Sequence, residues 1–419
     1  MSPTQPDPNP RAAPPADAAE RAAALAFDPL NLPPGFLENP FPTYHLLRRH
    51  DPVHRCPDGS YFLTRFADVT AVYRDRRMRS DKTVEFRPKF GGGALFRHHT
   101  TSLVFNDPPY HTRVRNLLIA PFTPRALRAM EPVIADLVER LLDAAEARGG
   151  MDLIADFAAA VPVEVICNML GVPRADRGPL RDYSLRILGA LEPAISAEQL
   201  AAGNRAVEQF SAYLDGLIVE RRRNLSDVPS DVLSALIRGG GEAEPLTQEE
   251  LIQNCIFLLN AGHETTTNLI GNGVAALIGH PGQMTLLRSR PELIESAVEE
   301  FLRFESSNQL GNRRVGTALE IGGVAMAEGT QITLCIGAAN RDPAQFPDPD
   351  RLDIERRPNP HLAFGAGIHA CADMTLARLE GRIAILRLIQ RFPNLHRSGT
   401  PERGGRARFR GYAAYPVSW

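Results

Sequence analysis

The sequence contains few cysteines, and their spacing fits neither a disulfide framework nor a zinc ribbon. The five residues are odd in number, lie far apart and include no Cys-x-x-Cys pair: Cys56, Cys167, Cys255, Cys335 and Cys371. Closely paired cysteines are what small secreted scaffolds and zinc ribbons require. Both classes are therefore excluded, and a reducing cytoplasmic location is favoured.

The chain also lacks a strong charge of either sign and a long apolar run. Its 47 basic and 49 acidic residues give a formal net charge of −2, which argues against nucleic acid as a partner. No window holds about 18 uninterrupted apolar residues, and the N-terminus has no apolar core of signal-peptide length. We therefore predict a monomer without a membrane span.

Large apolar residues are sparse in the first 25 positions, where six prolines stand among alanines and charged residues. Such a segment buries too little apolar surface to offset the entropy of ordering, so we predict a mobile tail over 1–25. Residues 26–419 contain no repeat and no linker. We expect them to form a single domain that is mainly α with a small β portion.

Helical periodicity dominates this domain. We predict helices over 42–49, from 109, over 124–148, 160–170, 196–223, 228–238 and 291–306. Short strands are expected over 53–56, 61–64, 318–325 and 331–336, and turn-rich β-like sequence at the C-terminus. The stretches 81–106 and 343–360 are irregular, which predicts long loops.

The longest predicted helix begins at the capping box Thr247–Glu250 and runs to about Gly279, before Pro281. A helix of about 32 residues is roughly 48 Å long. Because apolar residues cover much of its circumference, it should cross the middle of the fold.

The middle of this helix carries a polar motif, Ala261-Gly262-His263-Glu264-Thr265-Thr266, in apolar surroundings. A threonine there can bond back to a carbonyl and bend the helix, which would be a purely structural role. An acid beside a hydroxyl can equally serve function. The residues alone leave both interpretations open.

A second motif is Phe364-Gly-x-Gly-x-His-x-Cys371, followed at once by a helical pattern. A cysteine at the mouth of a helix meets backbone N–H groups and the positive end of the helix dipole, which favour thiolate. Gly365 and Gly367 permit a close approach, as a flat cofactor would require. Cys371 is thus a candidate soft-metal ligand or nucleophile, although a buried structural cysteine fits as well.

Together these motifs resemble those of the cytochrome P450s. The range Phe364–Cys371 is similar to the family's haem-binding signature, and Ala261–Thr265 to the segment that the family places over the haem iron. Further matches, in the family's order between about residues 107 and 391, are Glu300–Arg303, Ala338–Pro343 and Phe346–Pro349. The resemblance implies the P450 fold, with the long central helix over a haem.

The resemblance also implies roles for individual residues. Cys371 would ligate the iron of haem b, with Phe364, Gly365 and Ala261 against the haem. Thr265 would steady bound dioxygen, while Glu264 takes part in proton delivery.

Two further groups follow from the same resemblance. The haem propionates would be bound by His111, Arg115, Arg313 and His369, with Arg314 as the alternative if the register slips by one. The segment behind the haem would be supported by Glu300, Arg303 and Arg356, with Arg351 close enough in sequence to compete for the third place.

The chain departs from the family pattern at two places. Asp373 stands two residues after the cysteine, where glycine is usual, and a carboxylate there should disfavour added electron density at iron. The pair Ser306–Ser307 stands where many relatives carry a proline, which leaves the line of the substrate pocket there open.

The implied activity is a haem-thiolate monooxygenase that uses dioxygen and two electrons to hydroxylate a mostly apolar small molecule. We expect the electrons from a separate ferredoxin-type partner with its reductase, because the chain shows no Cys pattern for an iron–sulfur cluster. A peroxide-driven peroxygenase and a haem-binding sensor or carrier are the alternatives. The intact pair Glu264–Thr265 argues against the peroxygenase.

Substrate identity is not encoded in these motifs. We expect the pocket to be lined by 81–106, 175–200, Phe257, Leu258 and Asn308–Leu310, which favours an apolar ligand. The basic side chains of the 81–106 segment could hold a substrate carboxylate, although a solvated loop is the preferred interpretation: Arg87, Lys89, Arg97, His98 and His99. The basic residues Arg113, Arg125 and Arg128 either help to dock the electron donor or are solvated.

Overall fold

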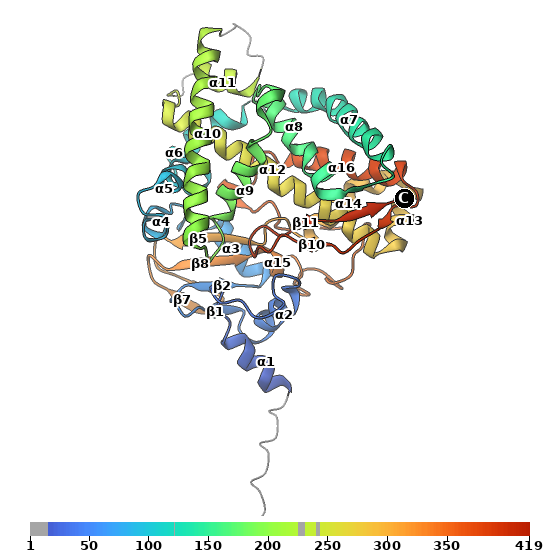
Figure 1. Cartoon of the computed structure of the whole chain (residues 1–419). Coiled ribbons are helices and arrows are strands. Elements are labelled where there is room, and N and C mark those ends of the chain that lie inside the picture. Colours follow the sequence, from blue (N-terminus) through green and yellow to red (C-terminus); the bar gives the residue numbers. More distant parts are fainter. Residues whose placement is uncertain (1–15, 121, 225–230, 240–243) are drawn as a thin grey trace, which may run out of the picture.

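The computed structural model describes residues 16–120, 122–224, 231–239 and 244–419. Helices make up most of this described chain (Figure 1). The α-helices are α1 (Ala16–Leu25), α2 (Phe41–His50), α3 (Phe66–Arg74), α4 (Thr83–Phe90), α5 (Ala94–Thr101), α6 (Tyr110–Ile119), α7 (Pro124–Glu146), α8 (Ala160–Met169), α9 (Leu180–Gly189), α10 (Ala197–Arg223), α11 (Val232–Arg238), α12 (Gln248–Gly279), α13 (Pro281–Ser289), α14 (Ile294–Phe304), α15 (Ile336–Ala339) and α16 (Met374–Arg391).

The strands are short and form four small sheets. They are β1 (Val53–Arg55), β2 (Tyr61–Leu63), β3 (Met78–Arg79), β4 (Gly150–Asp152), β5 (Leu310–Val315), β6 (Leu319–Ile321), β7 (Val324–Met326), β8 (Gln331–Cys335), β9 (His396–Arg397), β10 (Glu402–Arg403), β11 (Tyr412–Ala414) and β12 (Pro416–Ser418). Short helical turns are η1 (Leu103–Phe105), η2 (Leu153–Ala158), η3 (Arg174–Asp176), η4 (Pro291–Leu293) and η5 (Gly367–His369).

The largest sheet has the order β1-β2-β8-β5-β3, and its only parallel pair is β2 with β8. The hairpin β1–β2, in which Val53 faces Leu63, confirms the two strands predicted there. In Figure 1 this sheet lies with α1, α2 and α3 at the lower end, while α7, α8, α10, α12 and α16 form the helical upper part. The two parts meet where β5 and α15 approach the middle of the molecule.

The long helix α12 has the predicted bounds and the predicted capping box, in which Thr247 and Glu250 satisfy each other's backbone N–H groups. Most of its residues are buried, because α8, α9, α10, α14 and α16 pack around it. At Gly273 an added Cβ would stand 2.9 Å from both Phe301 and Ile385. The glycine thus lets α14 and α16 approach closely and holds α12 in the centre of the helical part.

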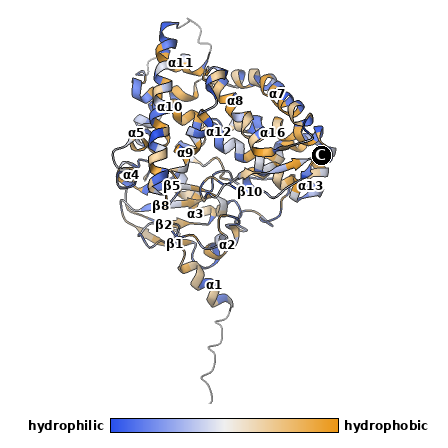
Figure 2. Ribbon diagram, in the orientation of Figure 1, coloured by the Kyte–Doolittle hydropathy of each residue, from blue (hydrophilic) through white to orange (hydrophobic). Residues whose placement is uncertain are grey.

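The outer helices are amphipathic, as their sequences predict. In Figure 2, α7 and α10 show hydrophilic and hydrophobic residues on opposite sides. On α7 the buried positions include Ile134, Leu137 and Val138, which join the core around α12 and α16. In the described residues, no helix combines the length and hydropathy that crossing a bilayer would require.

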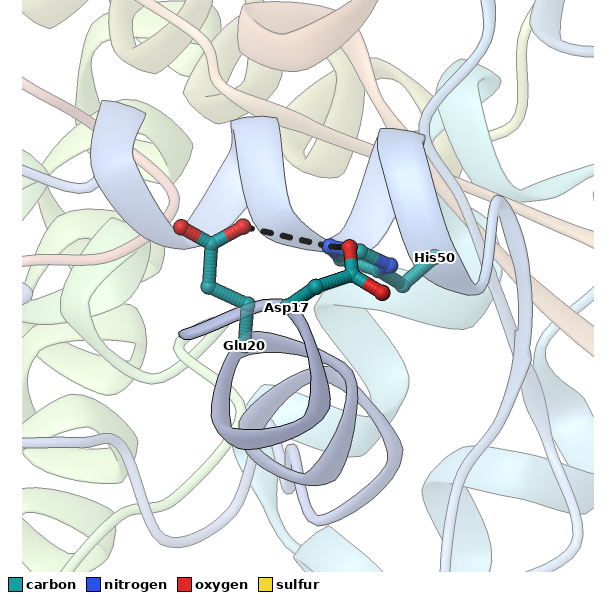
Figure 3. A group of neighbouring side chains, drawn as sticks. All are labelled: Asp17, Glu20 and His50. Atoms are coloured by element: carbon teal, nitrogen blue, oxygen red, sulfur yellow. Dashed lines mark hydrogen bonds and ion pairs between the residues drawn. The ribbon is translucent and has the colours of Figure 1, made fainter. Parts of the chain in front are cut away.

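The predicted mobile tail is wrong for residues 16–25, which form α1; the rest of the tail lies outside the described residues. Ala24 is buried against the core below the sheet, and Glu20 pairs with Arg49 and His50 of α2. Figure 3 shows Asp17 and Glu20 beside His50, whose Nε2 lies 3.3 Å from Glu20 Oε2. This contact with α2, rather than the local sequence, orders the segment.

Two other predictions are corrected. The expected loop 81–106 contains α4, α5 and η1, because Phe86, Phe90 and Leu95 bury their side chains in the helical core. The strand expected over 318–325 is the hairpin β6–β7, which turns at Gly322 and Gly323 with positive φ. The helix α9 and the strand β5 were not predicted, and the part of the predicted helix over 228–230 lies outside the described residues.

Candidate active site

An interior cavity of about 310 Å³ joins the loop before α16 to the middle of α12. It brings together elements that are far apart in the sequence: α5, α6, α12, β5 and the loops 363–373 and 404–411. Most of the predicted site residues line it, namely Arg115, Ala261, Thr265, Arg313, Phe364, Gly365, His369 and Cys371.

The loop that carries Cys371 is shaped by glycines. Gly365 and Gly367 have φ of 65° and 73°, and an added Cβ on Gly367 would stand 2.1 Å from the carbonyl oxygen of Tyr73. The backbone N–H of Cys371 donates to the carbonyl of Phe364 across 2.9 Å, which closes the loop. The backbone of Gly367 therefore lies close against the backbone of Tyr73. The close approach of a flat cofactor to this loop stays a prediction.

Two features of its surroundings act on the pKa of the Cys371 thiol. Burial raises the pKa of its thiol well above the ordinary value, and the carboxylate of Asp373 raises it further. These effects outweigh the backbone N–H of Asp373, which lowers the pKa. A bound metal cation is therefore needed to hold the thiolate form, as is usual for thiolate ligands.

A cluster of cationic and imidazole groups lies beside this loop. The rings of His111 and His369 lie against each other with centroids 4.1 Å apart and planes tilted by 50°. Arg115 donates to the carbonyl of Ala370 across 2.9 Å. Both ring nitrogens of His111 and Nε2 of His369 are buried without a hydrogen-bond partner among the described residues. Burial lowers the pKa of both imidazoles. The charges of Arg115 and Arg313 lower the pKa of His111 further, and those of Arg313, His111 and Arg115 lower the pKa of His369 further.

Arg313 completes this cluster. It lies on β5 with its guanidinium 5.1 Å from the centre of the Tyr73 ring, and it lines the cavity, whereas the alternative, Arg314, does not. Neither Arg115 nor Arg313 forms an ion pair with a carboxylate in the described part of the chain. Two such guanidiniums and the orphaned imidazoles fit the two carboxylates of a haem, so these residues are suited to the group.

Glu264 and Thr265 lie side by side on α12, but their side chains have different surroundings. The hydroxyl of Thr265 donates to the carbonyl of Ala261 across 2.6 Å and lines the cavity. Glu264 is buried and forms an ion pair with Arg406 through Oε1, while Oε2 has no hydrogen-bond partner among the residues that the structure describes. Burial raises the pKa of Glu264 to about 7, against the lowering effect of Arg406. The back-bond of Thr265 thus matches the structural interpretation of the motif, while its functional interpretation stays a prediction.

The predicted support behind the loop is a buried ion-pair network. Arg303 donates to both carboxylate oxygens of Glu300, at 2.7 and 2.8 Å, with both side chains fully buried. Arg356 lies 3.2 Å from the same carboxylate, whereas Arg351 contributes only its carbonyl oxygen, as an acceptor. Arg356 is therefore the third partner.

The basic residues of the 81–106 segment separate into two groups. Arg87 and Arg97 are exposed, and Arg87 lies over the ring of Phe96. His98 and His99, in contrast, are buried and line the cavity. Among the candidate docking residues, Arg113 is occupied by Glu250 and two backbone carbonyls, while Arg125 and Arg128 are exposed.

Several residues at this cavity were missed by the sequence analysis. Of these, only Arg408, on the loop between β10 and β11, lines the cavity. Arg406, on the same loop, reaches the site through its ion pair with Glu264. Glu192, in the segment after α9, accepts backbone N–H groups of that loop. No local motif marks them. Only the run Arg406-x-Arg408-x-Arg410, in a turn-rich stretch, could have drawn attention to the loop.

Comparisons with known proteins agree with this site. The family model for cytochrome P450 matches residues 192–403. A biotin biosynthesis cytochrome P450 of Bacillus subtilis is 39% identical over 365 residues, covering 86% of this chain and 91% of the relative. Vitamin D(3) 25-hydroxylase of Pseudonocardia autotrophica is 40% identical over 365 residues, 86% of this chain and 88% of the relative.

A solved structure shares the fold as well. P450BioI in complex with an acyl carrier protein that carries hexadec-9Z-enoic acid superposes with a TM-score of 0.87 at 37% identity, covering 92% of this chain and 98% of that one. Fold, site chemistry and relatives thus agree, and the chain belongs to the cytochrome P450 family of haem b monooxygenases.

Proposed function

We propose that Cys371 is the axial ligand of haem b, and that the enzyme hydroxylates a mostly apolar small molecule with electrons from a separate ferredoxin-type protein. The observation that supports this most is the position of Cys371, whose side chain lines the same cavity as Thr265 and an unpaired cation cluster. A thiolate ligand is the one that favours O–O cleavage at haem iron. The free state of all five cysteines is compatible with action in the cytoplasm.

The haem would be held at several points by this chain. Arg115, Arg313, His111 and His369 would bind its two carboxylates, since they offer donors without an acidic partner. Phe364, Gly365 and Ala261, which line or border the same cavity, would lie against the ring. When bound, the haem supplies the iron at which dioxygen is activated.

Glu264 and Thr265 would deliver protons. With a pKa of about 7, the carboxyl of Glu264 can both hold and release a proton near neutral pH. Arg406 fixes one carboxylate oxygen, which leaves Oε2 to exchange the proton. The hydroxyl of Thr265 donates its hydrogen to Ala261, so its oxygen is free to accept a hydrogen bond in the cavity.

The substrate would bind between apolar side chains of the same cavity, among them Leu118, Leu188, Phe257 and Leu258. These residues exclude water from the reacting centre. Two of the three proteins named above have names or titles that mention a small molecule: vitamin D(3) in the 25-hydroxylase, and hexadec-9Z-enoic acid on the acyl carrier protein in complex with P450BioI. Both of these molecules have large apolar bodies. A molecule with an apolar body is therefore the substrate class that we propose here.

The axial ligand is tested by the absorption spectrum of the reduced carbonyl complex. We expect the thiolate-type band in the native protein and its loss in Cys371→Ala. The control is Cys255→Ala, which replaces a buried cysteine of α12 and should keep the band. If Cys371→Ala retained that band, the assignment would be wrong. Product formation with surrogate ferredoxin, reductase and NADH, compared with peroxide alone, then separates the monooxygenase from a peroxygenase or a haem carrier.

A further inference from the structure

The cavity wall carries a cation that the haem site does not use. Arg408, on the loop between β10 and β11, lines the cavity and donates to three neutral oxygens: the carbonyls of Leu191 and Leu310, and Oδ1 of Asn312. A guanidinium has five N–H donors, so these contacts do not exhaust it. Arg408 forms no ion pair with any carboxylate of the described residues.

The charges around Arg408 do not balance within the protein. Lys89 donates to the backbone carbonyl of Glu192 across 2.6 Å and likewise forms no ion pair in the described chain. The carboxylate of Glu192 accepts the backbone N–H groups of Ala407 and Arg408 instead. Lys82 is neutralised by Glu85. Arg408 and Lys89 thus have one carboxylate near them, that of Glu192, and it already accepts backbone N–H groups.

Orphaned polar groups line the same cavity. Nε2 of His99, the side-chain oxygen and nitrogen of Asn260, and the hydroxyls of Ser80 and Ser307 are buried and have no hydrogen-bond partner in the described part of the chain. Each of these side chains is at least nine-tenths buried. Leaving buried polar groups unpaired destabilises a protein, so such groups indicate a ligand or ordered water that completes them.

His99 and Arg408 line the same cavity. Burial lowers the pKa of the His99 imidazole, and the charges of His98, Lys89 and Arg408 lower it further. A neutral imidazole beside a guanidinium can donate one hydrogen bond to an anion that the guanidinium attracts. A hydrocarbon ligand would leave Nε2 of His99 without a partner and the charge of Arg408 uncompensated. A neutral polar ligand would still leave the charge of Arg408 uncompensated.

We propose that the substrate is an amphipathic carboxylic acid, whose carboxylate binds Arg408 with His99 beside it and whose apolar body extends along Phe257 and Leu258. This rests on the proposed function, since it names the class of molecule that the monooxygenase oxidises. Arg408 is then a specificity-determining residue. The exposed Arg87 and Arg97 take no part.

The test uses the haem-loaded enzyme and matched probes. The panel consists of unbranched alkanoates of eight to sixteen carbons and 4-cyclohexylbutanoate, each with its methyl ester and the corresponding alcohol. Binding is measured by calorimetry and by the substrate-induced spin-state change. We expect at least one acid to bind about tenfold or more tightly than its ester and alcohol, and Arg408→Gln to remove that preference while leaving ester binding within about twofold.

Two controls separate recognition from structure. Arg288 also donates to two backbone carbonyls, at 2.9 Å each, but lies away from the cavity, so Arg288→Gln should keep the preference for the acid. Arg408→Lys retains the charge and should retain part of the preference. The reduced carbonyl spectrum of each variant is recorded first, so that a defect of the haem site is recognised independently.

Equal affinities for acids and esters throughout the panel, or no binding by any acid, would overturn the proposal. So would an Arg408→Gln variant that keeps the preference for the acid. A variant that lost acid and ester binding equally would assign Arg408 a structural role instead. None of these outcomes would affect the assignment of Cys371, which the carbonyl spectrum tests separately.

Discussion

The thiol of Cys371 donates a hydrogen bond to Oδ1 of Asp373 across 2.9 Å. Binding of a metal by the sulfur displaces the proton that this hydrogen bond uses. A thiolate and a carboxylate would then stand side by side, in a loop where burial already disfavours charge. Asp373 is therefore the residue of this loop with the largest expected effect on the electronic state of the site.

Replacement of Asp373 by glycine should raise the haem reduction potential. A negative charge beside the sulfur disfavours the added electron density of the reduced state, so its removal stabilises that state. We expect a rise on the order of 60 mV, which is a tenfold change in a one-electron equilibrium. The measurement is a spectroelectrochemical titration, with Asp373→Asn as the neutral control of similar size. An unchanged or lowered potential in both variants would contradict the argument.

The pKa of Glu264 predicts how turnover depends on pH. Burial raises this pKa to about 7, so the carboxyl holds its proton below pH 7 and loses it as the pH rises through that value. If Glu264 delivers protons, product formed per NADH should fall above about pH 7. Glu264→Gln should be roughly 100-fold less active, and its product formed per NADH should no longer fall above about pH 7.

Arg406 offers a second test of the same residue. Its charge lowers the pKa of Glu264, whereas Glu192 raises it and Arg181 adds a small lowering effect. In Arg406→Gln, the pH at which product formed per NADH (the coupling) falls should therefore be higher than in the native enzyme. A pH profile of coupling that was the same in Arg406→Gln and the native enzyme would show that another group titrates.

Breaking the buried ion pair of Glu300 should destabilise the fold strongly. Arg303→Met leaves a fully buried carboxylate with Arg356 as its remaining cation, and loss of one partner of a buried pair costs about 3–5 kcal/mol. The matched control is Arg382→Met. Arg382, on α16, forms an exposed ion pair with Glu295, which lies on α14 as Glu300 does. Loss of this exposed pair should cost below about 1 kcal/mol. Denaturant unfolding with a haem-content assay measures both.

The sequence allowed the main helices and the Cys371 loop to be predicted because their signals are local. The capping box of α12, the helical period of α7 and the glycine loop before α16 each determine nearby backbone. Glu300 and Arg303 lie three residues apart on one helix, so their contact also follows from local spacing.

The remaining features depend on contacts between distant segments. Residues 16–25 become helical against α2, and α4 and α5 form because their aromatic residues reach a core built by α10 and α12. Arg406 reaches Glu264 over 142 positions in sequence, and Arg408 reaches Asn312 over 96. No periodicity or spacing encodes such pairs. The burial of Cys371, which raises the pKa of its thiol, likewise depends on the whole fold and not on the local sequence.

Gly367 provides a test of how tightly the Cys371 loop is held. Two effects oppose a side chain there: the left-handed φ of 73°, and the carbonyl oxygen of Tyr73, which would stand 2.1 Å from an added Cβ. Gly323, in the turn between β6 and β7, has a φ of 86° but no atom within 4 Å of its added Cβ. Both Gly367→Ala and Gly323→Ala strain the backbone, but only Gly367→Ala also meets the carbonyl oxygen of Tyr73. The difference between the two variants therefore measures the effect of the contact with Tyr73.

Gly323→Ala should cost about 1 kcal/mol and leave the haem content of the protein unchanged. Gly367→Ala should cost more, because the backbone of Tyr73 or the loop itself has to move, and the displaced loop should hold haem less firmly. The measurements are the thermal midpoint and the rate of haem loss to an apo-globin acceptor. If the two variants lost haem at the same rate, the contact with Tyr73 would be irrelevant to the position of Cys371.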